Sequence, residues 1–564
     1  MISKIKKIIR DSKIDGYVVP KNDEYFTEYS NESNLKNLAN FTGSAGFALI
    51  LKKKNYLFVD GRYTIQAKKQ SGKKFIIYEI PYTWPKNLFD KLNQNLKIGF
   101  NPKLFTFNTL LRYFGNTCDL IPIYIDIFKK KKNKIIKENY FFTLDKKVTG
   151  KSSISKIYDV IKLLKKQKID HLFISSGENV CWLLNIRGKD LPNSPVANCQ
   201  LILSSSGVIH FFSNKKKVKK IKKKIKKNKI IFHEQEKFFD VLSLIKNGTF
   251  CVDNQTCSVF NENLIRSKFK IIKKEDPIYN LKSIKNNIEI NNMIKAHIED
   301  GVALTKFIYW IKNIKSFNID ELIVEKKLEK LRKKNKNYLY PSFSTIAGSG
   351  PNGAIIHYKS NKQTNRKINK KDLLLVDSGG QYKWGTTDVT RTITFDKQKN
   401  KIKKLYTRVL KGHIAVALSD IKYEINGHNI DKKARKSLNL IGLDYGHGTG
   451  HGVGFFLNVH EGPQSISKNN FIKLKEGMIV SNEPGYYLEN KFGIRIENLV
   501  FIKKSKNKLY FKNLTLAPLE KDLIDQKMLT KREKDYLFKY HLETYSKLSP
   551  FLKENEKKWL ARLI

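Results

Sequence analysis

The segment 446-GHGTGHGVG-454 has five glycines in nine residues, and this density restricts its backbone more than any other feature of the chain. Its two histidines, His447 and His451, stand four residues apart. On a helix they would share one face, as they do in zinc-binding helices. Because each glycine destabilises a helix by about 1 kcal/mol, a zinc helix is excluded. We expect an extended or looped backbone that lets another group come close.

The chain has 564 residues, which predicts several domains. Its hydrophobic content of 40% is typical of a globular protein. Five cysteines, an odd number with no C-x-x-C pair, argue against disulfides and structural zinc. No apolar run reaches about 18 residues, and the start has no signal peptide pattern. We therefore expect a cytoplasmic protein that does not bind membranes.

The net charge of +56 comes mainly from lysine, which is frequent in every segment. The even spread of lysine along the chain indicates a compositional bias. Nucleic-acid-binding proteins usually concentrate their positive charge in one region, so we do not expect nucleic-acid binding. The densest run, residues 215–229, has Val218, Ile221 and Ile225 at helical spacing. It predicts a surface helix with one buried stripe. The alternative is a contact with nucleic acid, an acidic partner or anionic lipid.

Helix-like and strand-like stretches alternate over residues 1–150, and a similar pattern restarts in 151–280. Strands are predicted at 17–20, 46–53, 56–60, 171–176 and 200–212. From residue 281 the pattern predicts a pair of long helices, another helix near 321–334, weakly charged strands, and a helical, aromatic-rich tail over 510–564.

Five residues of the third region form a candidate metal site. Asp377 ends one strand candidate and Asp388 begins the next, so a hairpin would bring them together. Glu483 and Glu497 lie on strands that we expect to be joined by a short turn, and His451 adds a nitrogen donor. Each residue alone is more often structural, but the ordered set suits two divalent ions whose charge balances four carboxylates.

Several motifs resemble the pita-bread metallopeptidases, specifically the three-domain aminopeptidase P family. In the third region they are 343-FSTIAGSGPNGAIIHY, 377-DSGGQYKWGTTDVTRT, 447-HGTGHGVGFFLNVHEGP, 480-VSNEPGYY and 493-GIRIEN. Upstream, 15-DGYVVPKNDEY, 41-FTGSAGFALI, 59-VDGRY and 180-VCWLLNIRGKDLPNSPV resemble the creatinase-like domains of that family.

The resemblance implies an α/β (α+β) fold with two creatinase-like domains, 1–150 and 151–280, and a pita-bread catalytic domain, 281–564. The helical extension 510–564 would help to form a homodimer. The alternative is that its aromatic residues pack on the chain's own catalytic domain. They are Tyr536, Phe538, Tyr540 and Trp559.

The implied activity is metal-dependent release of the N-terminal residue from peptides with proline in second position. Asp388 and Glu497 would bridge two ions, with Asp377 completing one shell and His451 and Glu483 the other. Glu483 would also handle the proton of the nucleophile. Family precedent favours Mn²⁺, and the ligand types also permit Zn²⁺ or Co²⁺.

Four further residues match substrate-contacting positions of the family: His357, His447, His460 and Arg495. The histidines would act in catalysis or line the proline pocket, and Arg495 would orient a carboxylate by bidentate pairing. The main alternative is a prolidase, which shares the ligands but generally has one N-terminal domain. Creatinase and methionine aminopeptidase fit less well, and non-catalytic relatives that bind RNA or chromatin proteins typically lack metal ligands.

Overall fold

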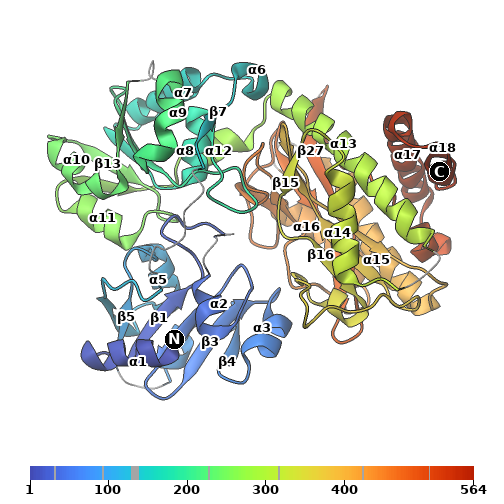
Figure 1. The fold of residues 1–564 in the computed structure, drawn as a ribbon, viewed down its shortest axis with the longest axis horizontal. Coiled ribbons are helices and arrows are strands. Elements are labelled where there is room, and N and C mark those ends of the chain that lie inside the picture. Colours follow the sequence, from blue (N-terminus) through green and yellow to red (C-terminus); the bar gives the residue numbers. More distant parts are fainter. Residues whose placement is uncertain are drawn as a thin grey trace. The chain divides into compact units, whose positions relative to one another are not determined.

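The structure is a computed structural model of the chain. It describes residues 1–28, 30, 33–91, 95–128, 139–225, 229–314, 318–421, 425–506 and 508–564. Contacts divide the chain into two compact units, Met1–Tyr279 and Asn280–Ile564 (Figure 1).

The first unit contains two six-stranded sheets with the same pairing pattern. Their strand orders are β4-β3-β2-β1-β5-β6 and β12-β11-β10-β8-β13-β14. In both, two antiparallel pairings in the middle are flanked by parallel ones. The predicted similarity of the two αβ regions is therefore visible in their topology. The strands are β1 Gly16–Pro20, β2 Phe47–Leu51, β3 Asn55–Asp60, β4 Ile76–Ile80, β5 Leu96–Phe100, β6 Cys118–Pro122, β8 His171–Ile174, β10 Gln200–Ser204, β11 Ile209–Phe212, β12 Ile230–His233, β13 Thr249–Val252 and β14 Lys270–Lys273.

The lysine-rich run forms helix α9, Lys215–Ile225, as predicted. Val218 and Ile221 are each 1% exposed and Ile225 is 6% exposed, while most of the lysines between them face solvent. The helix thus packs one apolar stripe on its sheet and keeps its charge in water. Residues 226–228 of the run lie outside the described residues.

The second unit begins within the short helix α12, Ile278–Ser283, and one long helix follows where the sequence predicted a pair of long helices. Helix α13, Asn287–Lys312, is 26 residues long. Asn286 caps it by accepting from the backbone N–H of Glu289, whose carboxylate accepts in return from the N–H of Asn286. Helices α14, Glu321–Arg332, α15, Asn400–Ala417, and α16, Gly427–Asn439, follow.

The strands of the second unit form one large and several small sheets. The large sheet has the order β21-β28-β27-β24-β22-β23, in which β21 is Asp420–Ile421, and a three-stranded sheet has the order β16-β17-β20. The strands that position the site are β16 Ile346–Ser349, β17 Leu374–Ser378, β20 Val389–Ile393, β22 Gly450–Gly452, β23 Glu461–Ile466, β24 Ile479–Asn482, β25 Gly485–Leu488, β26 Phe492–Arg495, β27 Asn498–Ser505 and β28 Lys508–Asn513. The α/β fold predicted from the sequence is confirmed.

The C-terminal region differs from the predicted helical extension in its first twenty residues. Strand β28 occupies its beginning, because alternate residues Leu509 and Phe511 are buried against the sheet while their neighbours are not. Helices α17, Lys531–Leu548, and α18, Glu554–Ala561, come only later and pack against α13 (Figure 1).

The aromatic residues of α17 and α18 differ in how deeply they are buried. Tyr540 is 3% exposed and belongs to the core of the unit, whereas Phe538 is 51% exposed. Tyr536 and Trp559 are partly buried against the same unit. Most of these residues therefore pack on their own domain. Within the described residues, no helix has both the length and the apolar character that crossing a bilayer requires.

Candidate metal centre

Two antiparallel strands position the first pair of carboxylates. Asp377 in β17 is the register partner of Thr390 in β20, and Asp388 directly precedes β20. The connection contains a small hairpin, β18 Gly380–Tyr382 with β19 Gly385–Thr386, as its turn-rich sequence predicts. The two aspartates therefore lie at neighbouring positions of adjacent strands.

The second pair of carboxylates lies at one end of β24 and β27. Asn482 of β24 is paired with Asn498 of β27, so Glu483, which follows the first, and Glu497, which precedes the second, lie together. They are separated along the chain by the β25–β26 hairpin and not by the short turn that we expected. The backbone N–H of Glu497 donates to the carbonyl of Thr390 at 3.1 Å, which joins the two pairs.

His451 lies in β22 with its imidazole directed at the carboxylates. Its Nδ1 is 2.9 Å from the carbonyl oxygen of Gly452, so Nδ1 is the donor and Nε2 is the nitrogen that faces the carboxylates. That Nε2 lies 3.4 Å from Oδ2 of Asp388 and 3.5 Å from Oε1 of Glu483. A divalent ion bound between these three atoms would be held by one nitrogen and two carboxylate oxygens. Metal-binding histidines commonly donate their other N–H to a backbone carbonyl in this way.

The glycines around His451 allow the strands to approach closely. A Cβ added at Gly450 would lie 1.9 Å from the carbonyl oxygen of Ser481 in β24. The backbone N–H of His451 donates to Oγ of Ser481 at 2.9 Å, and that hydroxyl donates to Oε1 of Glu483 at 2.9 Å. The extended, slim backbone predicted for residues 446–454 is therefore what brings His451 beside Glu483.

The donor set fits divalent cations. One ligand atom from each of Asp388, His451 and Glu497 lies within 4.8 Å of the other two. Burial, and then the neighbouring carboxylates, hold the pKa values of Asp388 and Glu497 well above their usual range. Oδ1 of Asp377 is buried and has no hydrogen-bond partner in the described part of the chain. Crowded carboxylates with an unsatisfied buried oxygen are stable when positive ions neutralise them.

Arg495 contacts the site and is only 1% exposed. Its Nη2 donates to Oδ2 of Asp377 at 2.6 Å, and its Nε donates to Oγ1 of Thr390 at 3.1 Å. Its Nη1 donates to the hydroxyl of Tyr487 at 2.7 Å. The guanidinium predicted to orient a substrate carboxylate is therefore engaged with a candidate metal ligand.

A directed hydrogen-bond chain leads from Arg495 to His447. Because Tyr487 accepts from Arg495, its own hydroxyl proton is available for Nε2 of His447, 2.9 Å away. Nδ1 of His447 lies 2.7 Å from the carbonyl oxygen of Gly448, which assigns the imidazole proton to Nδ1. The ring of His460 lies edge-on to that of His451, with 4.2 Å between centroids. His357 follows Ile356, whose carbonyl is 3.4 Å from Nη2 of Arg495.

The sequence matches the description "Metallopeptidase family M24" over residues 291–504 and "C-terminal region of peptidase_M24" over 507–563. Residues 1–123 and 131–289 each match "Creatinase/Prolidase N-terminal domain". A probable Xaa-Pro aminopeptidase P of Laccaria bicolor is 34% identical, with 100% of this chain and 92% of that protein covered. The Xaa-Pro aminopeptidase 1 of Dictyostelium discoideum is 34% identical over 100% of this chain and 96% of its own. The chain belongs to the aminopeptidase P family of M24 metallopeptidases.

Two solved structures differ in how much of this chain they match. An X-prolyl aminopeptidase of Caenorhabditis elegans, described as cytosolic with a di-nuclear active site, has a TM-score of 0.93 at 29% identity. It covers 100% of this chain and 98% of its own. A prolidase of Pyrococcus horikoshii, 27% identical with a TM-score of 0.53, matches over 99% of its length but only 65% of this chain. The predicted two creatinase-like domains followed by a pita-bread domain are thus confirmed.

Several residues around this aminopeptidase P centre were missed in the sequence. Thr390 donates from Oγ1 to Oε2 of Glu497 at 2.7 Å. Ser481 donates to Glu483, and the hydroxyl of Tyr487 contacts His447. Thr390 and Ser481 each stand two residues from a predicted ligand on a strand, so they share its face. That period-two spacing was a usable signal, whereas Tyr487 ends the quoted motif 480-VSNEPGYY and only its contact with His447 shows what it does.

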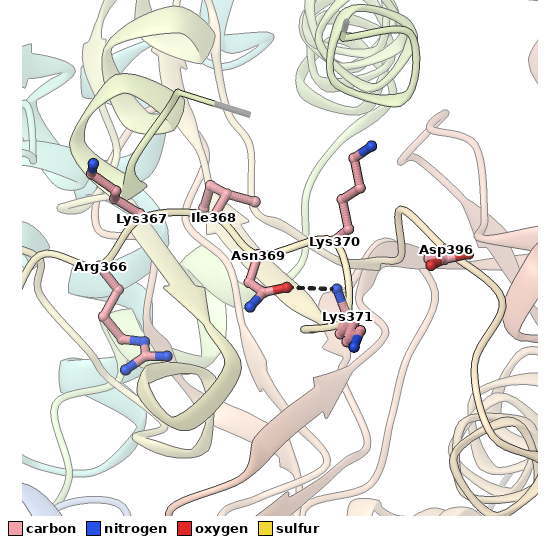
Figure 2. Close-up of a pocket in the computed structure, with 7 residues that line it drawn as sticks. All are labelled: Arg366, Lys367, Ile368, Asn369, Lys370, Lys371 and Asp396. Carbon is pink, nitrogen blue, oxygen red and sulfur yellow. Dashed lines mark hydrogen bonds between the residues drawn. The ribbon is translucent and has the colours of Figure 1, made fainter. Parts of the chain in front are cut away.

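An open hollow of about 790 Å³ lies elsewhere on the second unit (Figure 2). Asn369 accepts from the backbone N–H of Lys371 at 3.0 Å and closes the turn beneath it. The predicted site residues do not line it. Its lining is mostly exposed and cationic: Arg366, Lys367, Ile368, Asn369, Lys370, Lys371 and Asp396.

Proposed function

We propose that this chain is a metal-dependent Xaa-Pro aminopeptidase that releases the N-terminal residue from peptides with proline in second position. The observation that carries the proposal is the position of Nε2 of His451, 3.4 Å from Oδ2 of Asp388 and 3.5 Å from Oε1 of Glu483, within a buried carboxylate cluster. Relatives named Xaa-Pro aminopeptidase, matched over the whole chain, support the substrate class.

Two divalent ions are proposed to bind at Asp377, Asp388, His451, Glu483 and Glu497. Four carboxylates balance the charge of two such ions, and the di-nuclear site of the C. elegans enzyme supports this number. Mn²⁺ is our first choice, with Zn²⁺ or Co²⁺ compatible with the same oxygen-rich donors. When bound, such ions supply a water of lowered pKa and polarise the scissile carbonyl.

Glu483 is the carboxylate best placed to exchange a proton with the nucleophile. Its side chain is 18% exposed, compared with 11% for Asp377 and 5% for Asp388. Its Oε1 already accepts from Ser481, which orients the group. Partial exposure gives Glu483 access to substrate that the more deeply buried carboxylates lack.

His357, His447 and His460 are proposed to contact the substrate. All three are partly exposed, and His447 is held by Tyr487 on one nitrogen and the carbonyl of Gly448 on the other. The motif suggested that Arg495 binds the substrate. We propose instead that Arg495 positions Asp377. An Xaa-Pro bond has no N–H at its nitrogen, so its recognition must rely on the ring and the carbonyl.

The remaining expectations extend this proposal. We propose three domains, 1–150, 151–280 and 281–564, and a homodimer formed through the C-terminal region. Cytoplasmic location is supported by the cysteine usage and by the cytosolic relative from C. elegans.

The test is hydrolysis of Arg-Pro-Pro by metal-stripped protein with and without Mn²⁺ or Zn²⁺, beside the dipeptide Gly-Pro. We expect metal-dependent release of arginine and much weaker action on Gly-Pro. A preference for Gly-Pro would instead identify a prolidase. Folded protein that cleaves neither peptide with any ion would overturn the catalytic proposal.

A further inference from the structure

A buried arginine connects the metal centre to the C-terminal helices. Arg391 lies in β20 between Thr390 and Thr392 and is 4% exposed. It carries the five N–H donors of a rigid planar fork. Its nitrogens donate to the carbonyls of Thr390, Glu497, Ala517 and Pro518, to Oδ1 of Asn498 and to the hydroxyl of Tyr540, at 2.7 to 3.0 Å.

These acceptors are all neutral oxygens. Among the described residues, the acceptors that the Arg391 guanidinium contacts include no carboxylate oxygen. A buried charge without an ion-pair partner is stable only when its donors are satisfied by well-placed dipoles. Nη2 shares its two hydrogens among Asn498, Ala517 and Tyr540, so the C-terminal region supplies acceptors that help to set the position of Arg391.

One side of the fork holds a proposed metal ligand. Nη1 of Arg391 donates to the carbonyl of Glu497 at 2.7 Å and to that of Thr390 at 2.8 Å. Thr390 in turn donates from Oγ1 to Oε2 of Glu497 at 2.7 Å. The guanidinium thus fixes both the backbone of Glu497 and the residue that orients its carboxylate.

The other side of the fork is held by helix α17. Nη2 of Arg391 donates to the hydroxyl of Tyr540 at 3.0 Å, and this residue is 3% exposed. The same hydroxyl lies 2.8 Å from the carbonyl of Ala517, to which it donates, and accepts from the N–H of Ala517 at 3.2 Å. Because Ala517 also accepts from Arg391, the tyrosine closes a small network around the guanidinium.

We propose that Arg391 and Tyr540 are positioning residues through which the C-terminal helix α17 fixes Glu497 for metal binding. The inference rests on the proposed metal site. It gives the C-terminal region a role inside its own subunit, independent of dimer formation. Groups that orient metal ligands typically change metal affinity or activity by about 10–100-fold when they are replaced.

The test compares Tyr540→Phe with Tyr536→Phe in the full-length protein. Tyr536 lies one turn earlier on α17, and its hydroxyl accepts from Nδ2 of Asn513 at 3.1 Å, not from Arg391. Both variants remove one hydroxyl from the same helix. We would titrate metal-stripped protein with Mn²⁺ by calorimetry and measure the melting temperature of each metal-free variant.

We expect Tyr540→Phe to weaken Mn²⁺ binding by about 10-fold, and Tyr536→Phe to leave it within twofold of wild type. Equal Mn²⁺ affinity in both variants, even with lowered melting temperatures, would reduce Tyr540 to a stability role and overturn the inference. If Tyr540→Phe does not fold, Asn498→Ala removes another acceptor of Arg391 and must show the same direction of change. Wild-type protein that binds no Mn²⁺, Zn²⁺ or Co²⁺ would refute the metal site itself.

Discussion

Arg495 donates from Nη2 to Oδ2 of Asp377 at 2.6 Å, and both side chains are buried. The contact occupies one carboxylate oxygen and leaves Oδ1 of Asp377 buried without a partner in the described residues. A charge-assisted bond of this length fixes the rotamer of the aspartate. Asp377 is therefore held with one oxygen free for a cation before any ion arrives.

Replacing Arg495 with methionine should destabilise the protein. The change leaves the buried carboxylate of Asp377 without its ion-pair partner, which typically lowers the free energy of unfolding by about 3–5 kcal/mol. Arg366→Met is the control, because Arg366 faces Asp372 at 3.6 Å in a pair that is 43% and 25% exposed and is worth at most about 1 kcal/mol. Urea unfolding of both metal-free variants measures the difference, and equal costs would contradict the positioning role of Arg495.

Asp388→Asn should abolish tight metal binding and activity together. The substitution keeps the shape of a residue whose Oδ2 lies 3.4 Å from His451 but removes its charge. We expect metal affinity to fall by more than the about 100-fold that loss of a group orienting a metal ligand can cause. Asp396→Asn, at an exposed aspartate of the same unit, serves as the control. Metal content after dialysis and Arg-Pro-Pro hydrolysis report the two effects, and full metal occupancy in Asp388→Asn would rule out this ligand.

Protonation of His541 should loosen the C-terminal helices in acid. Burial, followed by the charge of Arg391, lowers the pKa of His541 to about 4 from an ordinary value of 6.5. Its Nε2 accepts from the N–H of Leu519 at 3.4 Å, so the folded state needs the neutral ring. The unfolded chain binds a proton below pH 6.5 and the folded chain does not, so stability falls as pH drops from 6.5 towards 4.

The expected loss is on the order of 3 kcal/mol across that window, at 1.36 kcal/mol per pKa unit. His541→Gln keeps an acceptor but cannot titrate. Urea unfolding at pH 7 and pH 4.5 should therefore show a smaller acid loss for His541→Gln than for wild type. The same pH dependence in both proteins would exclude His541 as its source.

The lysine-rich helix α9 should tolerate loss of its charges but not of its apolar stripe. Replacing Ile221, which is 1% exposed, with alanine should lower the free energy of unfolding by about 2–5 kcal/mol. Lys219→Ala and Lys223→Ala, at exposed positions of the same helix, should stay within about 0.5 kcal/mol of wild type. Thermal unfolding compares them, and a large effect of either lysine would indicate a specific contact.

Much of this protein follows from local sequence. The segments that form β1, β8 and β17 are visible because each carries a short run of apolar residues, as burial on a sheet requires. The glycines at 446–454 exclude a helix by their backbone entropy alone. The ordered Asp377, Asp388, His451, Glu483 and Glu497 match a family motif, so the candidate ligands could be named without coordinates.

Other features depend on contacts between distant segments. Residues 510–513 were expected to be helical but form β28, because pairing with β27 outweighs local preference. The motif suggested a substrate role for Arg495, and only the fold turns its guanidinium towards Asp377. Nothing near Tyr540 in the sequence indicates Arg391, 149 residues away. Periodicity and motifs determine the elements and the candidate ligands, whereas hydrogen bonds among buried groups from different strands and helices decide what each polar side chain holds in place.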